Sequence, residues 1–333
     1  MILKILFCIS ALLILHTYVV YPLLMVILDR LIRVKPLVKD DNFTPGVSVL
    51  MAVHNEEQVI GEKIKALFES DYPREKLEII AGSDASDDRT DEILEELCRT
   101  YPALKVHRFV KRQGKPGVIN ILSQKASGDI LIITDANVIP GRDAVKNLIG
   151  NFSDKSTGLA DTRLINTGIK RNGISVPEVA YISFESRLKD IEGKLWGTMM
   201  GPFGGFYAVR KESYQPNPEN ILADDFRICM NVILNGEKAI RDEKAVVYED
   251  VSNNLRDEFC RKVRISAGNF QNLVHFSSLL LRPFSRLSFC YISHKVLRWL
   301  TPFFWLTAML TNILLLGNSF LWLLLFLLQV IFL

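Results

Sequence analysis

Apolar residues fill both ends of the chain and recur in short runs between them. From Ile5 to Leu28 there are 24 residues without a charged side chain. A helix rising about 1.5 Å per residue crosses a hydrocarbon layer of about 30 Å with that length. We therefore expect a transmembrane helix within residues 1–30. A cleaved signal peptide is the alternative, but the run is too long for one and Val20–Leu23 lacks a small-residue cleavage pattern.

The C-terminal end is uncharged from Trp299 to Leu333. One helix of that length would overshoot a bilayer, so a break at Gly317–Ser319 predicts a transmembrane hairpin over residues 297–333. Its second span is short and lacks a charged flank, as expected of a partial span or a truncated chain. Residues 277–293 mix leucine and phenylalanine with arginine, which predicts an amphipathic helix in the membrane interface.

Basic residues flank the central region at both membrane junctions, which predicts a multi-pass protein of the cytoplasmic membrane with its central region inside the cell. These residues are Arg30, Arg33, Lys35, Lys39, Arg282, Arg286, Lys295 and Arg298. The five cysteines show neither metal-ligand spacing nor a disulfide framework, in keeping with a reducing compartment. A net charge of +3 is too small to suggest nucleic acid, and the basic clusters suit anionic membrane lipids.

The central region, residues 45–273, alternates β-rich runs with helical patterns and predicts one α/β domain. Strands are expected at Val47–Val53, Leu77–Gly82, Lys105–Phe109 and Ile130–Thr134. Apolar residues at helical spacing follow the first two, at Ile60, Ile64, Leu67 and Phe68 and then at Ile93, Leu94 and Leu97. This order indicates a doubly wound, mostly parallel sheet, which binds ligands beyond the carboxyl ends of its strands.

Acidic residues gather at these strand ends, in His54–Glu57, Ser83–Thr90 and Thr134–Asn137. Singly, each has an ordinary explanation: Asp88 and Glu56 can cap helices or lie in their first turns, and Asp-x-Asn is common in turns. Together, at three successive strand ends, they indicate a binding site for a divalent cation that carries a diphosphate.

Six motifs occur in the order found in a known family. They are VSVLMAVHNEEQVI, SDASDDRT, GKPGVIN, ILIITDAN, MGPFGGFYAVRKE and LADDF. The chain thereby resembles the inverting family 2 glycosyltransferases, which have the Rossmann-like GT-A fold and use nucleotide-sugar donors. The resemblance covers about Pro45 to Leu273.

The resemblance implies a donor site. Ala52, His54 and Glu56 would line the nucleoside pocket, and Asp84 would accept a hydrogen bond from the base, with uracil preferred. Lys115 matches the family's lysine near the donor, although an exposed turn lysine is the alternative. Asp135 and Asn137 occupy the DxD positions, which address the ribose and a Mg²⁺ or Mn²⁺ ion. Asn137 departs from the usual aspartate and brings no charge, which implies a weaker or missing metal ligand.

The resemblance also implies a catalytic base. The acceptor hydroxyl must lose its proton as it attacks the anomeric carbon. Asp225 matches the family's base, and Asp224 lies beside it on the acceptor side. Alternatively, both acids serve as cap and dipole partners of the helix that runs toward Asn235.

Two more segments would complete the site. Arg264 lies where processive synthases have QxxRW and is a candidate phosphate contact, but Arg261 and Ile265 replace the Gln and Trp, which favours transfer of a single sugar. For Arg261 and Lys262, a basic helix on the membrane surface is the alternative. Gly204 and Gly205 resemble the family's acceptor-side loop, although an ordinary turn before a strand at Phe206–Val209 would also use glycine.

The leading hypothesis is therefore inverting, metal-assisted transfer of one sugar to a saccharide or lipid-linked acceptor in cell-envelope or exopolysaccharide synthesis. Transfer to a polyprenyl phosphate is the rival within this class. From another class, Asn137 suggests a catalytically weak nucleotide-sugar-binding subunit of a larger complex. The sugar, the acceptor and the oligomeric state are not encoded in any motif.

Overall fold

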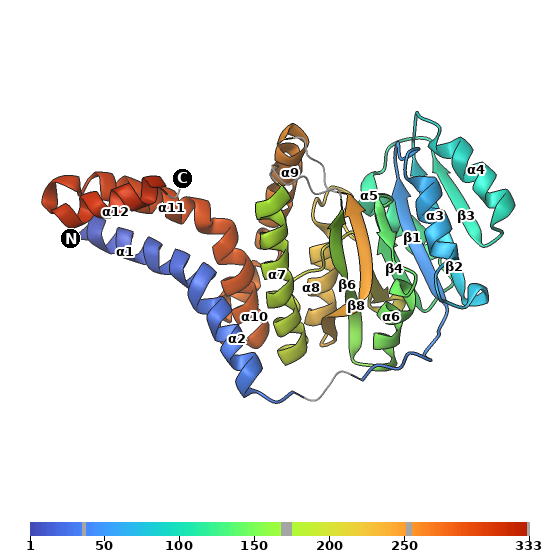
Figure 1. The fold of residues 1–333 in the computed structure, drawn as a ribbon, viewed down its shortest axis with the longest axis horizontal. Coiled ribbons are helices and arrows are strands. Elements are labelled where there is room, and N and C mark those ends of the chain that lie inside the picture. The colour runs from blue at the N-terminus through green and yellow to red at the C-terminus, as the bar shows by residue number, and fades with distance from the viewer. Residues whose placement is uncertain (35–37, 168–174, 251–254, 332–333) are drawn as a thin grey trace. The chain divides into compact units, whose positions relative to one another are not determined.

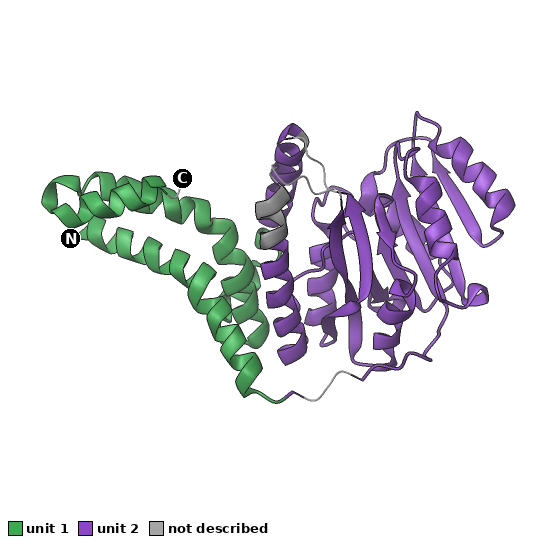
Figure 2. Ribbon diagram, in the orientation of Figure 1, with its two compact units in different colours: residues 1–33, 273–333 green, residues 34–272 purple. Residues whose placement is uncertain are grey.

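The computed structural model describes residues 1–34, 38–167, 175–250 and 255–331. Within them the chain forms two compact units (Figure 2). Residues 1–33 and 273–333 make the first unit, which is helical. Residues 34–272 make the second, which contains the sheet.

The second unit is built on an eight-stranded sheet with the strand order β3-β2-β1-β4-β7-β6-β8-β5 (Figure 1). The strands are β1 Val47–Val53, β2 Leu77–Asp84, β3 Leu104–Phe109, β4 Ile130–Thr134, β5 Val138–Pro140, β6 Thr157–Thr167, β7 Phe206–Arg210 and β8 Lys238–Asp250. The predicted strands are confirmed as β1 to β4 and β7.

The sheet is mixed, so the expectation of a mostly parallel sheet is only half right. Strands β3, β2, β1 and β4 are parallel neighbours, and β6 is parallel to β8. In contrast, β7 runs antiparallel to both β4 and β6, and β5 runs antiparallel to β8. The reason lies in the connection: β7 starts directly after the glycine-containing loop 201–205, next to the end of β4, and so runs back along it.

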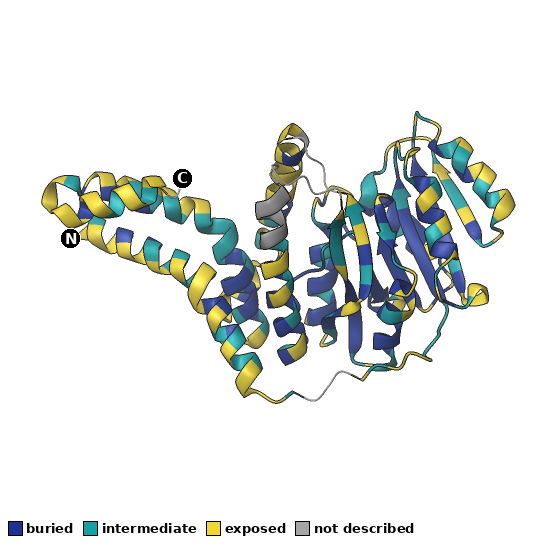
Figure 3. Ribbon diagram, viewed as in Figure 1, coloured by how far each residue is buried: buried dark blue, intermediate teal, exposed yellow. Residues whose placement is uncertain are grey.

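Helices accompany this sheet: α3 Ile60–Phe68, α4 Thr90–Thr100, α5 Gly114–Lys125, α6 Ala144–Gly150, α7 Ser175–Trp196, α8 Asp224–Leu234 and α9 Leu255–His275. Both helices expected after the first two strands are confirmed as α3 and α4. The apolar stripe of α3 is buried in one core with alternate residues of β1, such as Val49 and Met51. Strands β1 and β4 are largely buried (Figure 3).

The N-terminal part of the first unit is a continuous helix made of α1 Ile2–Leu15, a π turn His16–Val20 and α2 Tyr21–Leu31. Among the described residues, this is the one helix long and apolar enough to cross a membrane. It packs against α11 Leu297–Ile313. Phe7 meets Trp322 edge to face, with ring centroids 5.1 Å apart.

The C-terminal helices differ from the expectation. A turn at Leu316–Asn318 separates α11 from α12 Phe320–Ile331, as the predicted hairpin requires. Among the described residues, however, neither helix combines the length and hydropathy of a membrane span, so the expected multi-pass arrangement is not supported. The single helix expected over residues 277–293 is wrong. A 3₁₀ turn Ser277–Leu281 ends before Pro283, which has no backbone N–H, and α10 Arg286–Cys290 begins anew after the cap Ser285.

Candidate active site

The loops after β1 and β2 are tied to each other by side-chain hydrogen bonds. Asn55 Nδ2 donates to Asp87 Oδ1, and the backbone N–H of Asp87 donates to Asn55 Oδ1 at 3.0 Å. Next to this pair, the N–H of Glu57 donates to Asp88 Oδ2 at 3.1 Å. Asn55 and Ala85 both have φ of 56°, in the left-handed region. The acids of these loops therefore hold the backbone in an uncommon shape, and Asp88 also receives the N–H of Thr90 at the start of α4.

Asp84 is buried at the end of β2 and fixes the start of α5. Its Oδ1 accepts the N–H of Gln113 at 2.6 Å and its Oδ2 the N–H of Gly114 at 3.0 Å. Arg112 Nε lies 3.3 Å from Oδ2. His54 packs on the same turn, with Nδ1 3.1 Å from the backbone oxygen of Asp84. Oδ1 of Asp84 has a second lone pair, so this oxygen can still accept a hydrogen bond from a ligand.

Lys115, the second residue of α5, reaches the end of β4. Its Nζ lies 2.6 Å from Oδ1 of Asp135. Burial opposes its charge, but the carboxylates of Asp135, Asp224 and Asp225 raise the pKa of Lys115, which therefore stays cationic. One ammonium group thus faces acids from two distant segments, at the ends of β4 and at the start of α8.

Asp224 and Asp225 are the first two residues of α8, whose N-cap residue Ala223 makes no side-chain cap hydrogen bond. Asp224 is buried and its Oδ2 has no hydrogen-bond partner among the described residues. Asp225 is half-buried. Burial and the neighbouring Asp224 raise the pKa of Asp225 to about 6, while Lys115 works in the opposite direction. A carboxylate with a raised pKa is a stronger base and is still ionised at neutral pH.

The loop before β7 lies against the candidate base. Gly204 has φ of +85°, and a Cβ atom there would overlap Oδ2 of Asp225. Gly205 approaches Val138 in the same way, and its carbonyl oxygen accepts the N–H of Asp135 at 3.0 Å. Glycine at both positions therefore allows the loop to fit between the end of β4 and the start of α8.

Asp135 and Asn137 leave two oxygens suited to a divalent cation. Lys115 occupies Oδ1 of Asp135, and Asn137 Nδ2 donates to Oε1 of Glu249 at 3.2 Å. Within the described residues, Oδ2 of Asp135 and Oδ1 of Asn137 carry no hydrogen bond. Burial and the charge of Asp135 also raise the pKa of Glu56, a sign that negative charge accumulates there. In the described part of the chain, no cluster of three or more His, Cys, Asp or Glu side chains forms a preorganised metal site. These residues fit a metal held by two protein oxygens and the donor's diphosphate.

Helix α9 is fixed to the segment that precedes the candidate base. Asn272 Nδ2 donates to the carbonyl oxygen of Ala223 at 3.0 Å, and Gln271 Oε1 accepts the N–H of Leu222 at 3.0 Å. A Cβ atom on Gly268 would lie 2.8 Å from the nitrogen of Ala223. Arg264 lies one turn before Gly268 on the same helix and is exposed. In the described part of the chain it makes no hydrogen bond or ion pair with the other candidate residues.

Several buried polar residues at the site were not predicted from the sequence. Asp161 of β6 accepts the N–H of Phe203 at 3.1 Å, and Glu192 of α7 accepts the N–H of Met200 at 3.3 Å. Both are fully buried and hold the loop 201–205 in place. The hydroxyl group of Tyr207 is buried without a partner among the described residues, and nearby acids help to raise its pKa. For Asp161, the sequence did offer a signal: a polar residue inside the apolar run Gly158–Leu164 indicates a buried polar group.

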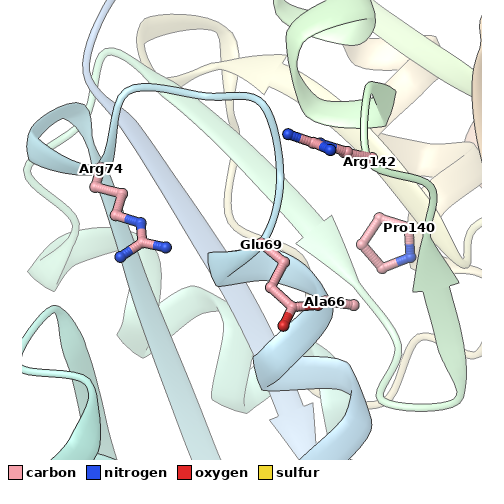
Figure 4. A pocket seen from close by; sticks show the side chains of 5 residues that line it. All are labelled: Ala66, Glu69, Arg74, Pro140 and Arg142. Atoms are coloured by element: carbon pink, nitrogen blue, oxygen red, sulfur yellow. The ribbon is translucent and has the colours of Figure 1, made fainter.

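One cavity of the structure lies away from these residues. It has a volume of about 400 Å³ and is lined by Ala66, Glu69, Arg74, Pro140 and Arg142 (Figure 4). Since α3 runs back along β1, its last turn and Arg74 lie at the amino ends of the parallel strands. The acidic cluster lies at the opposite, carboxyl edge, where sheets of this kind bind ligands.

The mixed sheet, with acidic residues gathered at the carboxyl ends of its parallel strands, is an α/β fold of the GT-A type. Residues 48–216 match glycosyl transferase family 2. The chain belongs to this family of nucleotide-sugar-dependent glycosyltransferases, which confirms the resemblance seen in its motifs.

The proteins similar to the chain include two curated relatives and one solved structure. The probable glycosyltransferase YdaM of Bacillus subtilis is 35% identical over 130 residues, 37% of this chain and 30% of YdaM. A beta-monoglucosyldiacylglycerol synthase of Synechocystis is 34% identical over 133 residues, 38% of this chain and 28% of the synthase. The chain thus spans less than a third of the length of these relatives. The mannosyltransferase PcManGT of Pyrobaculum calidifontis, solved with GDP-Man and Mn²⁺, has a TM-score of 0.75 and 23% identity, covering 94% of this chain and 88% of that one. This last likeness supports the fold.

Proposed function

We propose that the protein transfers a single sugar from a nucleotide sugar, preferably a UDP-sugar, to a lipid-linked or saccharide acceptor at a membrane, with inversion at the anomeric carbon. One observation carries this proposal: Lys115 pairs with Asp135 at the end of β4 and faces Asp224 and Asp225 at the start of α8. A donor diphosphate and an acceptor hydroxyl can meet between these two segments.

The donor's nucleoside would bind at the carboxyl ends of β1 and β2. Ala52, His54 and Glu56 would line its pocket, and His54 already rests on the backbone of Asp84. Asp84 would accept the N–H of a uracil ring with a lone pair that the Gln113 and Gly114 amides do not use.

The diphosphate would be neutralised by the cationic side chains and a divalent ion. Oδ2 of Asp135 and Oδ1 of Asn137 would hold Mg²⁺ or Mn²⁺, which, when bound, stabilises negative charge on the departing diphosphate. The presence of Mn²⁺ in the PcManGT structure supports such an ion. Lys115 would exchange part of its pairing with Asp135 for the phosphate, and Arg264 would add a second cation from α9.

Proton transfer would fall to Asp225. The acceptor hydroxyl attacks the anomeric carbon on the face opposite the diphosphate, and its proton passes to a carboxylate oxygen of Asp225 as the carbon–oxygen bond to the diphosphate breaks. The raised pKa of Asp225 suits this task. Gly204 and Gly205 would shape the acceptor side, and Asp224 would lie beside the acceptor.

Membrane anchoring fits the first unit. The helix Ile2–Leu31 can cross a bilayer, and its exposed apolar side chains, such as Leu12 and Leu23, suit lipid contact. Because basic residues follow this helix, the second unit would face the cytoplasm. The apolar C-terminal helices would also contact the membrane. The lipid product named for the Synechocystis synthase supports a lipid acceptor.

A panel of nucleotide sugars tests the donor assignment. With Mn²⁺ or Mg²⁺ present, UDP-sugars should raise the thermal midpoint of the purified protein, and Asp84→Ala should abolish the shift. Equal shifts from all nucleotides would contradict the base assignment.

An activity measurement tests the catalytic role. Release of UDP with membrane lipid extract as acceptor should be present for the natural protein and lost in Asp225→Asn, whose donor-induced thermal shift should persist. Binding without turnover in both proteins would instead indicate a nucleotide-sugar-binding subunit.

A further inference from the structure

A lysine is completely buried beneath the loop that carries Asp135 and Asn137. Lys63 lies on α3 among Ile60, Ile64 and Leu67, in the apolar stripe that faces the sheet, and its exposed fraction is 0%. Burial of an unpaired lysine amine is strongly unfavourable, so a lysine persists in such a place only where its hydrogen bonds are made. Nothing in the donor or acceptor chemistry assigned above uses this charge.

The ammonium group of Lys63 bridges the two ends of the β4–β5 loop. Nζ donates to Oγ1 of Thr134 at 2.7 Å and to the backbone oxygen of Val138. It also lies 4.9 Å from the ring centroid of Phe206, the first residue of β7. Asp135 and Asn137 therefore lie between two residues, Thr134 and Val138, that both accept hydrogen bonds from this buried lysine.

The same contacts extend to the loop beside the candidate base. Oγ1 of Thr134, which accepts from Lys63, donates to the carbonyl oxygen of Gly205 at 2.9 Å. That carbonyl also accepts the N–H of Asp135 at 3.0 Å. Its neighbour Gly204 abuts Oδ2 of Asp225. A continuous series of contacts thus runs from the buried ammonium through the metal-side loop to the base.

We propose that Lys63 is a positioning residue that sets the spacing between the donor loop at Asp135 and the base Asp225, through Thr134 and Gly205. This inference rests on the proposed function. Lys63 touches neither substrate nor metal and acts through the backbone of two loops. Transfer requires the donor and the base to be in register, and a misplacement of about 1 Å can lower a rate about 100-fold.

The test is Lys63→Met, which keeps the length and apolar character of the side chain and removes the ammonium group. We expect kcat to fall about 10- to 100-fold, while KM for the donor changes by less than about 3-fold. Ile64→Val, at the next residue in the same core, is the matched control, since it removes one buried methyl group and no hydrogen-bonding group. A similar loss of kcat in Ile64→Val would overturn the proposal.

A second readout does not depend on activity. Hydrogen exchange, followed by mass spectrometry in protein without metal or donor, reports the N–H of Asp135 that bonds to Gly205. We expect about tenfold faster exchange in the peptide containing Asp135 in Lys63→Met but not in Ile64→Val. Unchanged exchange and unchanged kcat in Lys63→Met would overturn the proposal. If only the proposed function is wrong, the faster exchange in Lys63→Met should still be seen, because this experiment does not depend on activity.

Thr134→Val covers the case in which Lys63→Met does not fold. It removes the hydroxyl group that relays Lys63 to Gly205 and keeps the branched shape of a β-strand residue. It should reproduce the loss of kcat and the faster exchange. If both variants fold, the double variant should lose little more kcat than either single one, because the two residues act in series. Additive losses would overturn the relay.

Discussion

The carboxylate of Asp225 lies directly against the Cα atom of Gly204. A side chain at that glycine would overlap Oδ2 of the acid, and its φ of +85° already disfavours any other residue. We predict that Gly204→Ala destabilises the protein by about 1 kcal/mol or more through strain and moves the base, with kcat reduced about 100-fold. Steady-state transfer assays and a denaturation midpoint measure the two effects.

Gly236 is the matched control for this change. It has nearly the same φ, +88°, and a Cβ atom there would meet nothing within 4 Å. Gly236→Ala should show the backbone cost while leaving kcat unchanged. If the two alanine variants had the same kcat, the contact between Gly204 and Asp225 would not matter for catalysis.

The pH dependence of transfer should report Asp225. Its pKa is raised from 3.8 to about 6 by burial and by Asp224, and only the ionised form can accept a proton. The value of kcat/KM should therefore rise with pH and be half-maximal near 6. Because the folded state favours the protonated acid, the contribution of Asp225 to stability should fall as pH rises from about 4 to about 6. A flat kcat/KM between pH 5 and 7 would contradict this assignment.

Lys115 should affect both donor binding and the base. Lys115→Met removes a cation that lowers the pKa of Asp225, so the acid limb of kcat/KM should move to higher pH. Loss of a charged hydrogen bond to the diphosphate should weaken donor binding by about 10- to 100-fold. Lys125→Met, at the exposed last turn of the same helix, is the control and should change neither quantity.

Ala85 should be a site of stored backbone strain. Its φ of 56° places an alanine in the left-handed region after β2. Ala85→Gly should raise the free energy of unfolding by about 0.5–1 kcal/mol, measured by chemical denaturation. The same substitution in the interior of α3, Ala66→Gly, should lower it by a similar amount. Destabilisation by both changes would show that the loop depends on the alanine methyl group.

Burial of Lys63 should be visible in the pH dependence of stability. Burial lowers its pKa from 10.5 to about 7, so the unfolded chain binds this proton more tightly than the folded protein. The free energy of unfolding should rise between about pH 7 and pH 10, by up to about 1.4 kcal/mol per pH unit from this group. In Lys63→Met this rise should be missing when denaturation is followed at each pH.

The elements that the sequence predicted well are those with a simple apolar pattern. Strand β4, Ile130–Thr134, is buried at all five positions and has the predicted bounds. Strand β2 continues past Gly82 because Ser83 and Asp84 are buried in spite of their polarity. Strands β6 and β8 were not predicted, since charged residues such as Asp161 interrupt their apolar pattern.

Those parts of the candidate site that consist of side chains in motifs could be predicted from the sequence. Those parts that depend on backbone groups could not. The motifs led to Lys115, Asp135 and Asp225: the ammonium group of Lys115 pairs with Asp135, and Asp225 helps to raise its pKa. The partners of Asp84 are backbone amides, which no side-chain pattern reveals. Lys63 was missed because a lysine between apolar residues is usually solvated at the edge of a helix, whereas here it is enclosed.

The reciprocal hydrogen bonds between Asn55 and Asp87 bear on attempts to redesign donor choice. The turns after β1 and β2 hold each other in a left-handed conformation. Replacing only one of them by the turn of a homologue would leave polar groups without hydrogen-bond partners where the two turns meet. Exchange of nucleotide preference between related enzymes should therefore succeed only when both turns are grafted as a single piece.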